Sequence, residues 1–387
     1  MVILKRIILG IIDLLKLFPY FLVEAFTKSS PKDTEEKSLL IVKLDEIGDY
    51  ILFRNFLKDI KNLQKFSDYK ITLCGNDIWR SITEKLDIKY LDDFIWIDKK
   101  RFLNNYFYRR KIIKKIKLQK FDKVINASYS RKYYLDDSVV KWAVSNNKIG
   151  FETDLSNCFI WQKSISDKYY DTLINTSKVR FEFLKNKLFY SKILEEKVSV
   201  EKPDIDVNDI STKFEMAEDY IVFYMGGRKK YKRWTILNFV EVARFIELNY
   251  NCKIILIGSE SDKRFSSAFL SKHQSSIVID LTGKTFLLDV IKIATNAKVV
   301  LSNDSGIAHI SAAVGTPTIV LLSGTHFGRF FPYPSEIGLK VHSFYPPEIM
   351  DRLTEADLLT GEFRYILSSD INLIRPELVN KRMANWF

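Results

Sequence analysis

The chain has 387 residues, a formal net charge of +12 at pH 7 and 47% hydrophobic residues. This length and composition support buried cores in two or three domains and exclude a disordered protein. The positive charge indicates an anionic partner, which nucleic acid, an anionic membrane or a phosphorylated substrate would each satisfy. Cys74, Cys158 and Cys252 lie far apart in or near apolar runs, so we expect reduced thiols in a cytoplasmic fold and no metal site.

Residues 2–26 predict an amphipathic helix. Its four charged residues before the proline, Lys5, Arg6, Asp13 and Lys16, fall in one stripe at helical spacing and leave a broad face of Ile, Leu and Phe. The helix has three possible positions: in the cytoplasmic membrane interface, docked on the protein's own surface, or across the membrane. The charges argue against a span. A signal peptide is not expected, because Asp13 interrupts the apolar core.

A first α/β domain is predicted to follow a polar linker. Ser38–Leu44 is a buried type of strand, and Gly48 and Asp49 open a helix at its carboxyl end, where open α/β sheets bind ligands. The further strand-like runs are 70–74, 94–97, 123–127 and 148–151. Their alternation with helical or basic segments predicts a doubly wound domain.

Residues 99–123 carry eleven basic side chains and one acidic one, interleaved with aromatic residues. Three interpretations stay open for this segment. It is a solvated lysine-rich helix, a patch that meets lipid headgroups or a phosphorylated acceptor, or a nucleic-acid surface.

Two apparent motifs are rejected. Asp204 and Asp206 have the letters of a metal-binding DxD motif but lie in a polar linker. Residues 282–285, TGKT, resemble the end of a P-loop, but Val278 stands where that loop needs glycine. No GxGxxG follows a strand either, so P-loop and dehydrogenase functions are not expected.

The second domain begins with a strand at Tyr220 that leads into Gly226 and Gly227 and then into a basic loop. The glycines permit close approach of the backbone to a ligand, and Lys232 or Arg233 supplies charge-assisted hydrogen bonds to phosphate oxygens.

Another acidic residue, Glu260, follows the strand Lys253–Ile257. A carboxylate at that position suits ribose hydroxyls, as in dinucleotide sites, or simply caps the next helix.

The segment Ala297–Thr325 is the most informative part of the chain, because it reads as a strand, a turn, a helix and a second strand. The N–H groups at the start of the helix, Ile307–Val314, offer an anion site. In the preceding turn, Asn303, Asp304 and Ser305 are candidate caps and Gly306 permits close approach of a ligand. Asp304 either caps the helix or anchors a cation or sugar hydroxyl. His309 is either structural or a ligand contact.

Taken together, several segments resemble glycosyltransferase family 9, the heptosyltransferases of lipopolysaccharide synthesis. The segments are IVKLDEIGDYIL, GGRKKYKRWTILNFVEVARFI, LIGSESD, DLTGKTFLLDVIKIATNAKVVLSNDSGIAHISAAVGTPTIVLLSGT and RFFPY, in family order over residues 38–345. The resemblance implies a GT-B fold with two Rossmann-like domains facing a cleft. It also implies inverting transfer that needs no metal or other cofactor.

The resemblance assigns roles by position. Asp49 matches the catalytic base, Lys232 the phosphate-binding lysine and Glu260 the nucleoside contact. The donor-binding turn is matched by Asp304, Ser305, Gly306 and His309. These roles are chemically consistent, because inversion needs one carboxylate to take the acceptor proton and a cationic site for the departing diphosphate.

We therefore predict five segments. They are an amphipathic leader and linker (1–37), an acceptor-binding domain (38–200), a linker (201–218), a nucleotide-sugar-binding domain (219–345) and a helical tail (346–387). The predicted donor is ADP-heptose, and the predicted acceptor is lipid-linked or an oligosaccharide of lipopolysaccharide or a related surface glycan. An anionic membrane surface, at the inner face of the cytoplasmic membrane, is a further expected partner, and nucleic acid is not.

Alternatives are transfer of a hexosaminyl or other hexosyl group, a catalytically inactive GT-B binding protein, and a sugar-nucleotide epimerase. The chain departs from the family pattern in its more basic GGRKKYKRW loop, in residues 90–200 and in its leader.

Overall fold

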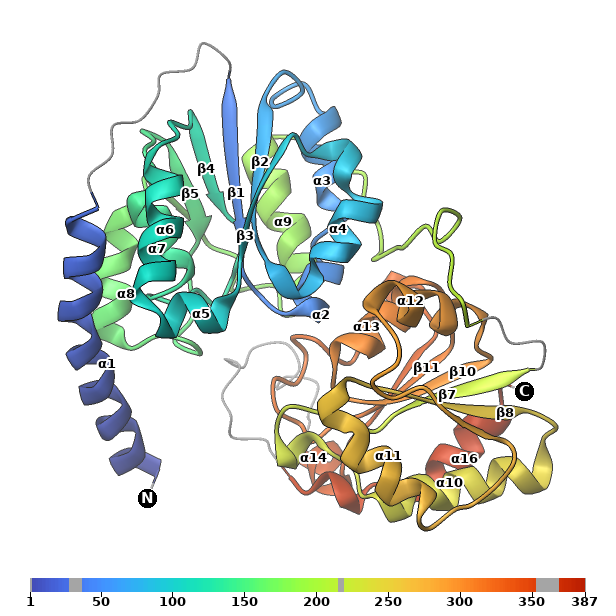
Figure 1. Ribbon diagram of the computed structural model, residues 1–387. Helices are drawn as coiled ribbons and strands as arrows, with labels where there is room; N and C mark the ends of the chain where they lie inside the picture. Colours follow the sequence, from blue (N-terminus) through green and yellow to red (C-terminus); the bar gives the residue numbers. More distant parts are fainter. Residues whose placement is uncertain (1, 28–36, 215–218, 353–368, 387) are drawn as a thin grey trace.

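The computed structural model describes residues 2–27, 37–214, 219–352 and 369–386. Two α/β domains lie one above the other, with the first helix along the outer side of the upper one (Figure 1). Each domain is built on a six-stranded sheet, and all strand pairs within both sheets are parallel. The predicted fold class, α/β with two Rossmann-like domains, is confirmed.

The first sheet has the strand order β3-β2-β1-β4-β5-β6. Its strands are β1 (Ser38–Lys43), β2 (Lys70–Asn76), β3 (Asp93–Ile97), β4 (Lys123–Asn126), β5 (Lys148–Phe151) and β6 (Thr172–Ile174). Leu39 and Ile41 of β1 pack into one core cluster, and Leu40 and Val42 pack into another on the opposite face. Burial on both faces explains why this strand is a continuous apolar run.

Helices cover both faces of this sheet (Figure 1). One layer contains α3 (Phe56–Asn62), α4 (Arg80–Leu86) and α9 (Glu182–Leu194), and the other contains α5 (Lys99–Asn104), α6 (Tyr106–Lys117) and α7 (Asp136–Trp142). The short helix α2 (Ile47–Ile51) follows β1 on the side that faces the second domain.

The second sheet repeats this topology with the order β12-β11-β10-β7-β8-β9. Its strands are β7 (Tyr220–Tyr224), β8 (Lys253–Ile257), β9 (Val278–Asp280), β10 (Val299–Asn303), β11 (Thr318–Leu321) and β12 (Val341–Phe344). One face carries α10 (Ile236–Asn249), α11 (Lys263–Leu270) and α16 (Pro376–Ala384). The other carries α12 (Leu287–Asn296) and α13 (Gly306–Ala313), which lie toward the first domain (Figure 1).

The strand order reverses between β1 and β4 in the first sheet and between β7 and β10 in the second. Crevices at such reversal points are where open α/β sheets bind ligands. The two domains also share one apolar cluster, in which Ile291 and Ile310 of the second domain pack with residues of the first. The loops after these four strands are therefore the first place to look for a site.

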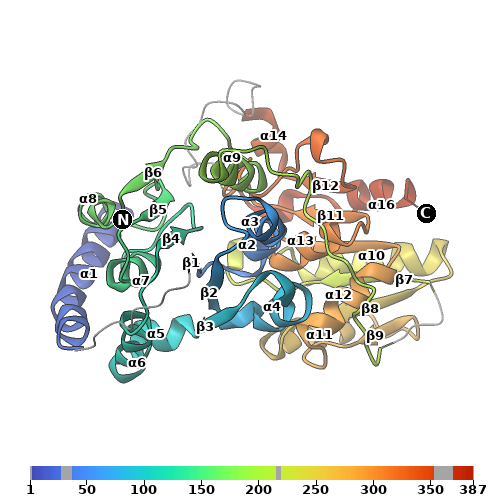
Figure 2. The same cartoon turned by 90° about the horizontal axis from the view of Figure 1, so that it is seen from above.

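Helix α1 (Val2–Ala25) is docked on the first domain, beside α6 and α8 (Ile160–Ser166) (Figures 1 and 2). Its buried Glu24 accepts hydrogen bonds from Arg109 Nε at 2.8 Å, Ser138 Oγ at 2.8 Å and Trp142 Nε1 at 2.6 Å. Removing one partner of such a buried ion pair typically costs about 3–5 kcal/mol, so this network holds the helix in place.

The outer face of α1 is mostly apolar. Its large exposed apolar side chains are Ile11, Leu14, Leu15, Phe18 and Phe21, and Lys16 is exposed among them. The predicted amphipathic helix is confirmed, and of the positions considered for it, docking on the protein's own surface is the one observed. Among the described residues, no helix has both the length and the apolarity that crossing a membrane requires.

The basic segment 99–123 forms α5 and α6, and several of its cations make internal contacts. Arg109 is buried against Glu24, and Lys117 Nζ donates to the carbonyl oxygens of Glu24 and Thr27 at 2.7 and 3.1 Å. Arg110, Lys111 and Lys114 are exposed. The segment is thus partly structural, and its exposed face retains positive charge.

The predicted division into five segments stays a prediction. Most of the linker at 27–37, the end of the linker at 201–218 and part of the tail at 346–387 lie outside the described residues.

Candidate functional site

The two domains meet where α2 and α13 begin. A Cβ atom added to Gly48 would lie 2.6 Å from Cδ2 of His309, and one added to Gly306 would lie 3.0 Å from Cβ of Ile47. Neither distance leaves room for a larger residue, so two glycines, one from each domain, bring the helices into direct contact. The start of α13 also has free backbone N–H groups that favour an anion.

Asp49 lies on α2 at this junction and is partly buried. The backbone N–H of Glu46 donates to its Oδ2 at 3.3 Å. Burial and the negative charge of Asp45 raise the pKa of Asp49 to about 6, although Lys43 opposes the shift. At neutral pH the carboxylate is therefore mostly ionised and is basic enough to accept a proton.

Asp45 and Lys43 form a buried pair beside Asp49. Lys43 Nζ lies 2.9 Å from Oδ2 of Asp45 and donates to the carbonyl oxygen of Ala127 at 2.8 Å. Burial alone would raise the pKa of Asp45, but the positive charges of Lys43 and Lys132 outweigh it and hold the pKa well below its usual value. Neither residue was among the predicted site residues, although Asp45 directly follows the predicted strand Ser38–Leu44.

The loop after β4 adds further charges to the same end of the sheet. Asp136 Oδ2 accepts from the backbone N–H of Lys132 at 2.7 Å. Burial and the negative charge of Asp45 raise the pKa of Asp136 to about 7. The loops after β1 and β4, at the reversal point of the first sheet, therefore carry a cluster of opposite charges around Asp49.

Arg329 joins the second domain to this cluster. From the loop after β11, its Nε donates to Glu182 Oε2 at 2.9 Å and its Nη1 donates to Ser130 Oγ at 2.6 Å. Its positive charge also lowers the pKa of Asp49, in opposition to the effect of burial. Arg329 lies in the RFFPY segment but was not among the predicted site residues.

Lys232 and Asp304 form an ion pair in the second domain, with 2.6 Å between Nζ and Oδ2. Asp304 directly precedes α13, whose N-cap is Ser305 and has no side-chain cap hydrogen bond. Asp304 is thus not a helix cap, and the alternative interpretation of it as a plain cap is wrong. Lys232 is held beside the start of α13.

Asn303 is buried and fixes the basic loop against this turn. Its Nδ2 donates to the carbonyl oxygens of Met225 and Gly226 at 2.9 and 3.0 Å, and its Oδ1 accepts from the backbone N–H of Trp234 at 3.1 Å. Both ends of the loop that carries Lys232 are therefore tied to the end of β10.

Three other predicted residues of this loop pack against protein atoms. A Cβ on Gly226 would lie 2.7 Å from Asp262 Oδ1, and one on Gly227 would lie 3.0 Å from Arg233 Cγ. The guanidinium of Arg233 lies 4.9 Å from the centre of the Phe265 ring. Of the two predicted cations, Lys232 is thus the one paired with Asp304 at the α13 turn.

Glu260 lies after β8 and is exposed, with Oε1 2.8 Å from Lys263 Nζ. The helical turn here is capped by other residues, since the backbone N–H of Ser259 donates to Asp262 Oδ2 at 2.9 Å. The interpretation of Glu260 as a helix cap is therefore wrong, and its carboxylate is accessible to a ligand.

His309 is buried at the contact between the domains. Its Nδ1 lies 2.9 Å from the hydroxyl of Tyr333, and its ring stacks on Phe331 at 4.6 Å and 17°. Burial lowers the pKa of His309 to about 4, so the ring is neutral at pH 7. Within the described part of the chain, no group of three or more His, Cys, Asp or Glu residues could hold a metal ion.

Comparison with known proteins agrees with this arrangement. The model of glycosyltransferase family 9 (heptosyltransferase) matches residues 109–340, which is more than half of the chain. Lipooligosaccharide heptosyltransferase 2 of Haemophilus influenzae is 27% identical over 142 residues, covering 36% of each chain. Lipopolysaccharide heptosyltransferase 2 of Salmonella typhimurium is 29% identical over 93 residues, covering 23% of this chain and 26% of that protein. The chain thus matches about a third or less of the length of these curated relatives.

Solved structures share the fold over nearly their whole length. A family 9 glycosyltransferase from Veillonella parvula has a TM-score of 0.70 at 18% identity, covering 92% of this chain and 99% of that one. The Escherichia coli heptosyltransferase WaaC with ADP-2-deoxy-2-fluoro heptose has a TM-score of 0.66 at 16% identity, covering 90% and 99%. The family match over more than half of the chain shows that the chain belongs to glycosyltransferase family 9, the heptosyltransferase family.

Proposed function

We propose that the chain is an inverting, metal-independent heptosyltransferase that moves heptose from ADP-heptose to a lipopolysaccharide or related surface-glycan acceptor. The observation that carries this proposal is the contact between α2 and α13. It places Asp49, with its raised pKa, beside the turn that holds Lys232 and Asp304.

In the proposed reaction, Asp49 takes the proton of an acceptor hydroxyl while that oxygen attacks the anomeric carbon of the donor. The new C–O bond forms on the face opposite the diphosphate, and the bond from the carbon to the diphosphate oxygen breaks. The negative charge of the departing ADP is stabilised by Lys232 and the N-terminal end of α13. The positive charge that stabilises the departing diphosphate is then supplied by a side chain and by backbone N–H groups.

The donor site is proposed to lie in residues 219–345 and the acceptor site in residues 38–200. Lys232 would contact the diphosphate, and Glu260, accessible after β8, would accept hydrogen bonds from the nucleoside. Ser305, Gly306 and His309 line the turn between them. Three other predicted residues would have an indirect role, because they shape the loop that carries Lys232 and would not contact the donor. These residues are Asn303, Gly226 and Gly227.

Four alternatives differ from this proposal. A hexosaminyl or hexosyl transferase would use the same residues with another donor. An inactive binding protein would not need a partly buried carboxylate with a pKa near neutrality, so Asp49 argues against it. An epimerase would consume donor without an acceptor. Nucleic-acid binding is disfavoured because part of the basic segment 99–123 is used in internal contacts.

We also propose that the protein lies at the inner face of the cytoplasmic membrane as a peripheral protein. The apolar outer face of α1 and the net charge of +12 both favour an anionic lipid surface.

Asp49→Asn should abolish transfer and leave donor binding nearly unchanged. The amide keeps the shape of the side chain but cannot take the acceptor proton, so kcat should fall by about 10²–10⁴-fold. Transfer is measured with ADP-heptose and an acceptor, and donor affinity is measured by calorimetry. Asp68→Asn, a surface carboxylate paired with Lys37, serves as the control. Retained turnover in Asp49→Asn would remove it as the base.

The pH dependence of kcat/KM should show a fall below a pH of about 6, where Asp49 becomes protonated. Asp45→Asn removes the negative charge that raises this pKa, so the acid limb should move to lower pH by roughly one unit. Asp136→Asn is the control and should leave the limb nearly in place, because Asp136 is not among the main groups that shift the pKa of Asp49. An acid limb that stays fixed in Asp45→Asn would contradict the assignment of this limb to Asp49.

Lys232→Ala should weaken ADP-heptose binding by roughly 10–100-fold, since a hydrogen bond to a charged group contributes about 1.5–3 kcal/mol. The readout is the rise in melting temperature that a native-state ligand causes, measured across a panel of nucleotide-sugars. Lys230→Ala removes an exposed lysine from the same loop and is the matched control. Equal losses of affinity in both variants would indicate a general electrostatic effect instead of a phosphate contact. A larger rise in melting temperature with another nucleotide-sugar would identify that compound, and not ADP-heptose, as the donor.

The double variant Ile11→Ser/Leu15→Ser should reduce flotation with phosphatidylglycerol vesicles several-fold, because it removes apolar area from the outer face of α1. Point changes are preferable to truncation, which would leave Arg109 buried without its carboxylate. Leu248→Ser is the control, since Leu248 is 84% exposed on α10 of the other domain. An unchanged vesicle-bound fraction in the double variant would rule out α1 as the membrane contact.

A further inference from the structure

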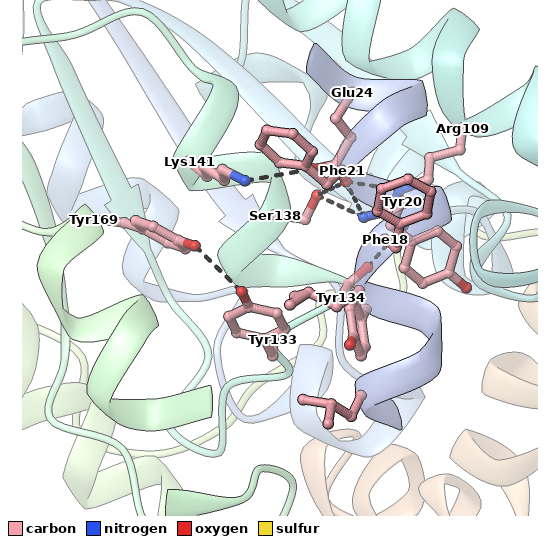
Figure 3. Close-up of a pocket in the computed structure, with 12 residues that line it drawn as sticks. Phe18, Tyr20, Phe21, Glu24, Arg109, Tyr133, Tyr134, Ser138, Lys141 and Tyr169 are labelled. Atoms are coloured by element: carbon pink, nitrogen blue, oxygen red, sulfur yellow. Dashed lines mark hydrogen bonds and ion pairs between the residues drawn. The ribbon is translucent and has the colours of Figure 1, made fainter. Parts of the chain in front are cut away.

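A cavity of about 350 Å³ lies between α1 and the first domain, and neither Asp49 nor Lys232 lines it. Figure 3 shows α1 on one side of it and the segment with Tyr133 and Tyr134 on the other. Its volume is within the range of roughly 300–1,000 Å³ that is typical of ligand pockets. Neither the proposed donor site nor the catalytic carboxylates use this space.

The walls of the cavity are mostly apolar and aromatic. Helix α1 contributes Leu14, Phe18 and Phe21, and the first domain contributes Tyr133 and Tyr169. Phe18 and Phe21 are 68% and 52% exposed, so the apolar lining is continuous with the outer face of the helix. A ligand that enters from that face would transfer its apolar part from water into the apolar cavity, which is favourable.

One end of the cavity carries an excess of positive charge. Arg109 is matched by Glu24, whose two carboxylate oxygens already accept hydrogen bonds from Arg109, Ser138 and Trp142. Lys141 Nζ lies 3.8 Å from Oε2 of Glu24, and it makes no hydrogen bond with any residue that the structure describes. One carboxylate thus faces two cations, and the ammonium of Lys141 has unused donors beside the slot.

This combination selects the chemistry of the ligand. An apolar slot with a cation at its end that only shares a carboxylate with Arg109 suits an amphiphile with a hydrocarbon chain and an anionic head. A free sugar would leave its hydroxyls against aromatic and aliphatic walls, and a free phosphate would use only the lysine. The slot opens along the face of α1 that we propose to contact the membrane.

We propose that this pocket binds one acyl chain of an anionic phospholipid, with the lipid phosphate at Lys141. This inference deepens the proposed membrane association and rests on it for the source of the lipid. A bound chain would contact α1 and the loop with Tyr133 and Tyr134 at once. This loop is already joined to the helix, because the hydroxyl of Tyr134 donates to the backbone carbonyl oxygen of Asp13.

The test uses the full chain and dihexanoyl phosphatidylglycerol below its critical micelle concentration, so that vesicle adsorption does not contribute. Calorimetry should give saturable binding of one lipid per chain. Phe18→Ser and Lys141→Gln should each weaken it by about tenfold. Dihexanoyl phosphatidylcholine, whose head is neutral overall, should bind more weakly to the unmodified chain, and inorganic phosphate alone should not bind measurably.

Two matched variants control for general effects. Phe26→Ser changes an equally exposed phenylalanine, at 69% against 68% for Phe18, that follows α1 and does not line the cavity. Lys168→Gln removes an exposed lysine that does not line the cavity either. Both should retain the affinity of the unmodified chain, and circular dichroism should show that all four variants are folded.

Three results would overturn the proposal: no binding of the monomeric lipid, equal losses in the control variants, or phosphate binding as tight as lipid binding. Because donor binding and transfer are measured separately, a chain without heptosyltransferase activity that still binds the lipid would leave the pocket assigned and reject the proposed reaction.

Discussion

The close contact between Gly48 and Gly306 determines how the two domains face each other. Helix α2 follows β1 and helix α13 follows β10. The two helices can approach this closely because each has a glycine at the meeting point. Any larger residue would push the domains apart. The approach brings the reversal points of both sheets together, and the charged residues of each lie around it.

Ion pairs within the protein already hold the charges at this junction in place. Lys43 is fixed by Asp45 and a backbone carbonyl, and Lys232 is fixed by Asp304 on a loop that Asn303 ties down. Such preorganisation matters because a site that need not rearrange stabilises developing charge at little cost. The same packing raises the pKa of Asp49 to about 6, because Asp49 is desolvated and lies near the carboxylate of Asp45.

Most of the fold could be predicted from the sequence, because strands covered on both faces are continuous apolar runs. The exception is β6, which was missed because it has three residues, one of them exposed, at the edge of the sheet. Asp49, Lys232 and Asp304 could be selected because they follow strands or glycine turns. Glu182 and Arg329 could not, because they are 147 positions apart and meet only in the folded chain. Asn303 could be selected from its position in the turn before the helix. The sequence does not show that its amide oxygen and its amide nitrogen both bind the neighbouring loop.

The glycine contact also bears on how the molecule opens. The backbones of the two domains lie closest at this point, so a rotation of one domain against the other would be centred near it. Two ion pairs join the domains near it, between Glu46 and Arg228 at 3.2 Å and between Glu182 and Arg329 at 2.9 Å, and such a rotation would strain both. Asp49 is next to Gly48 in the chain, so such a rotation would change the distance between Asp49 and the turn with Asp304 least, and would move the outer parts of the domains most.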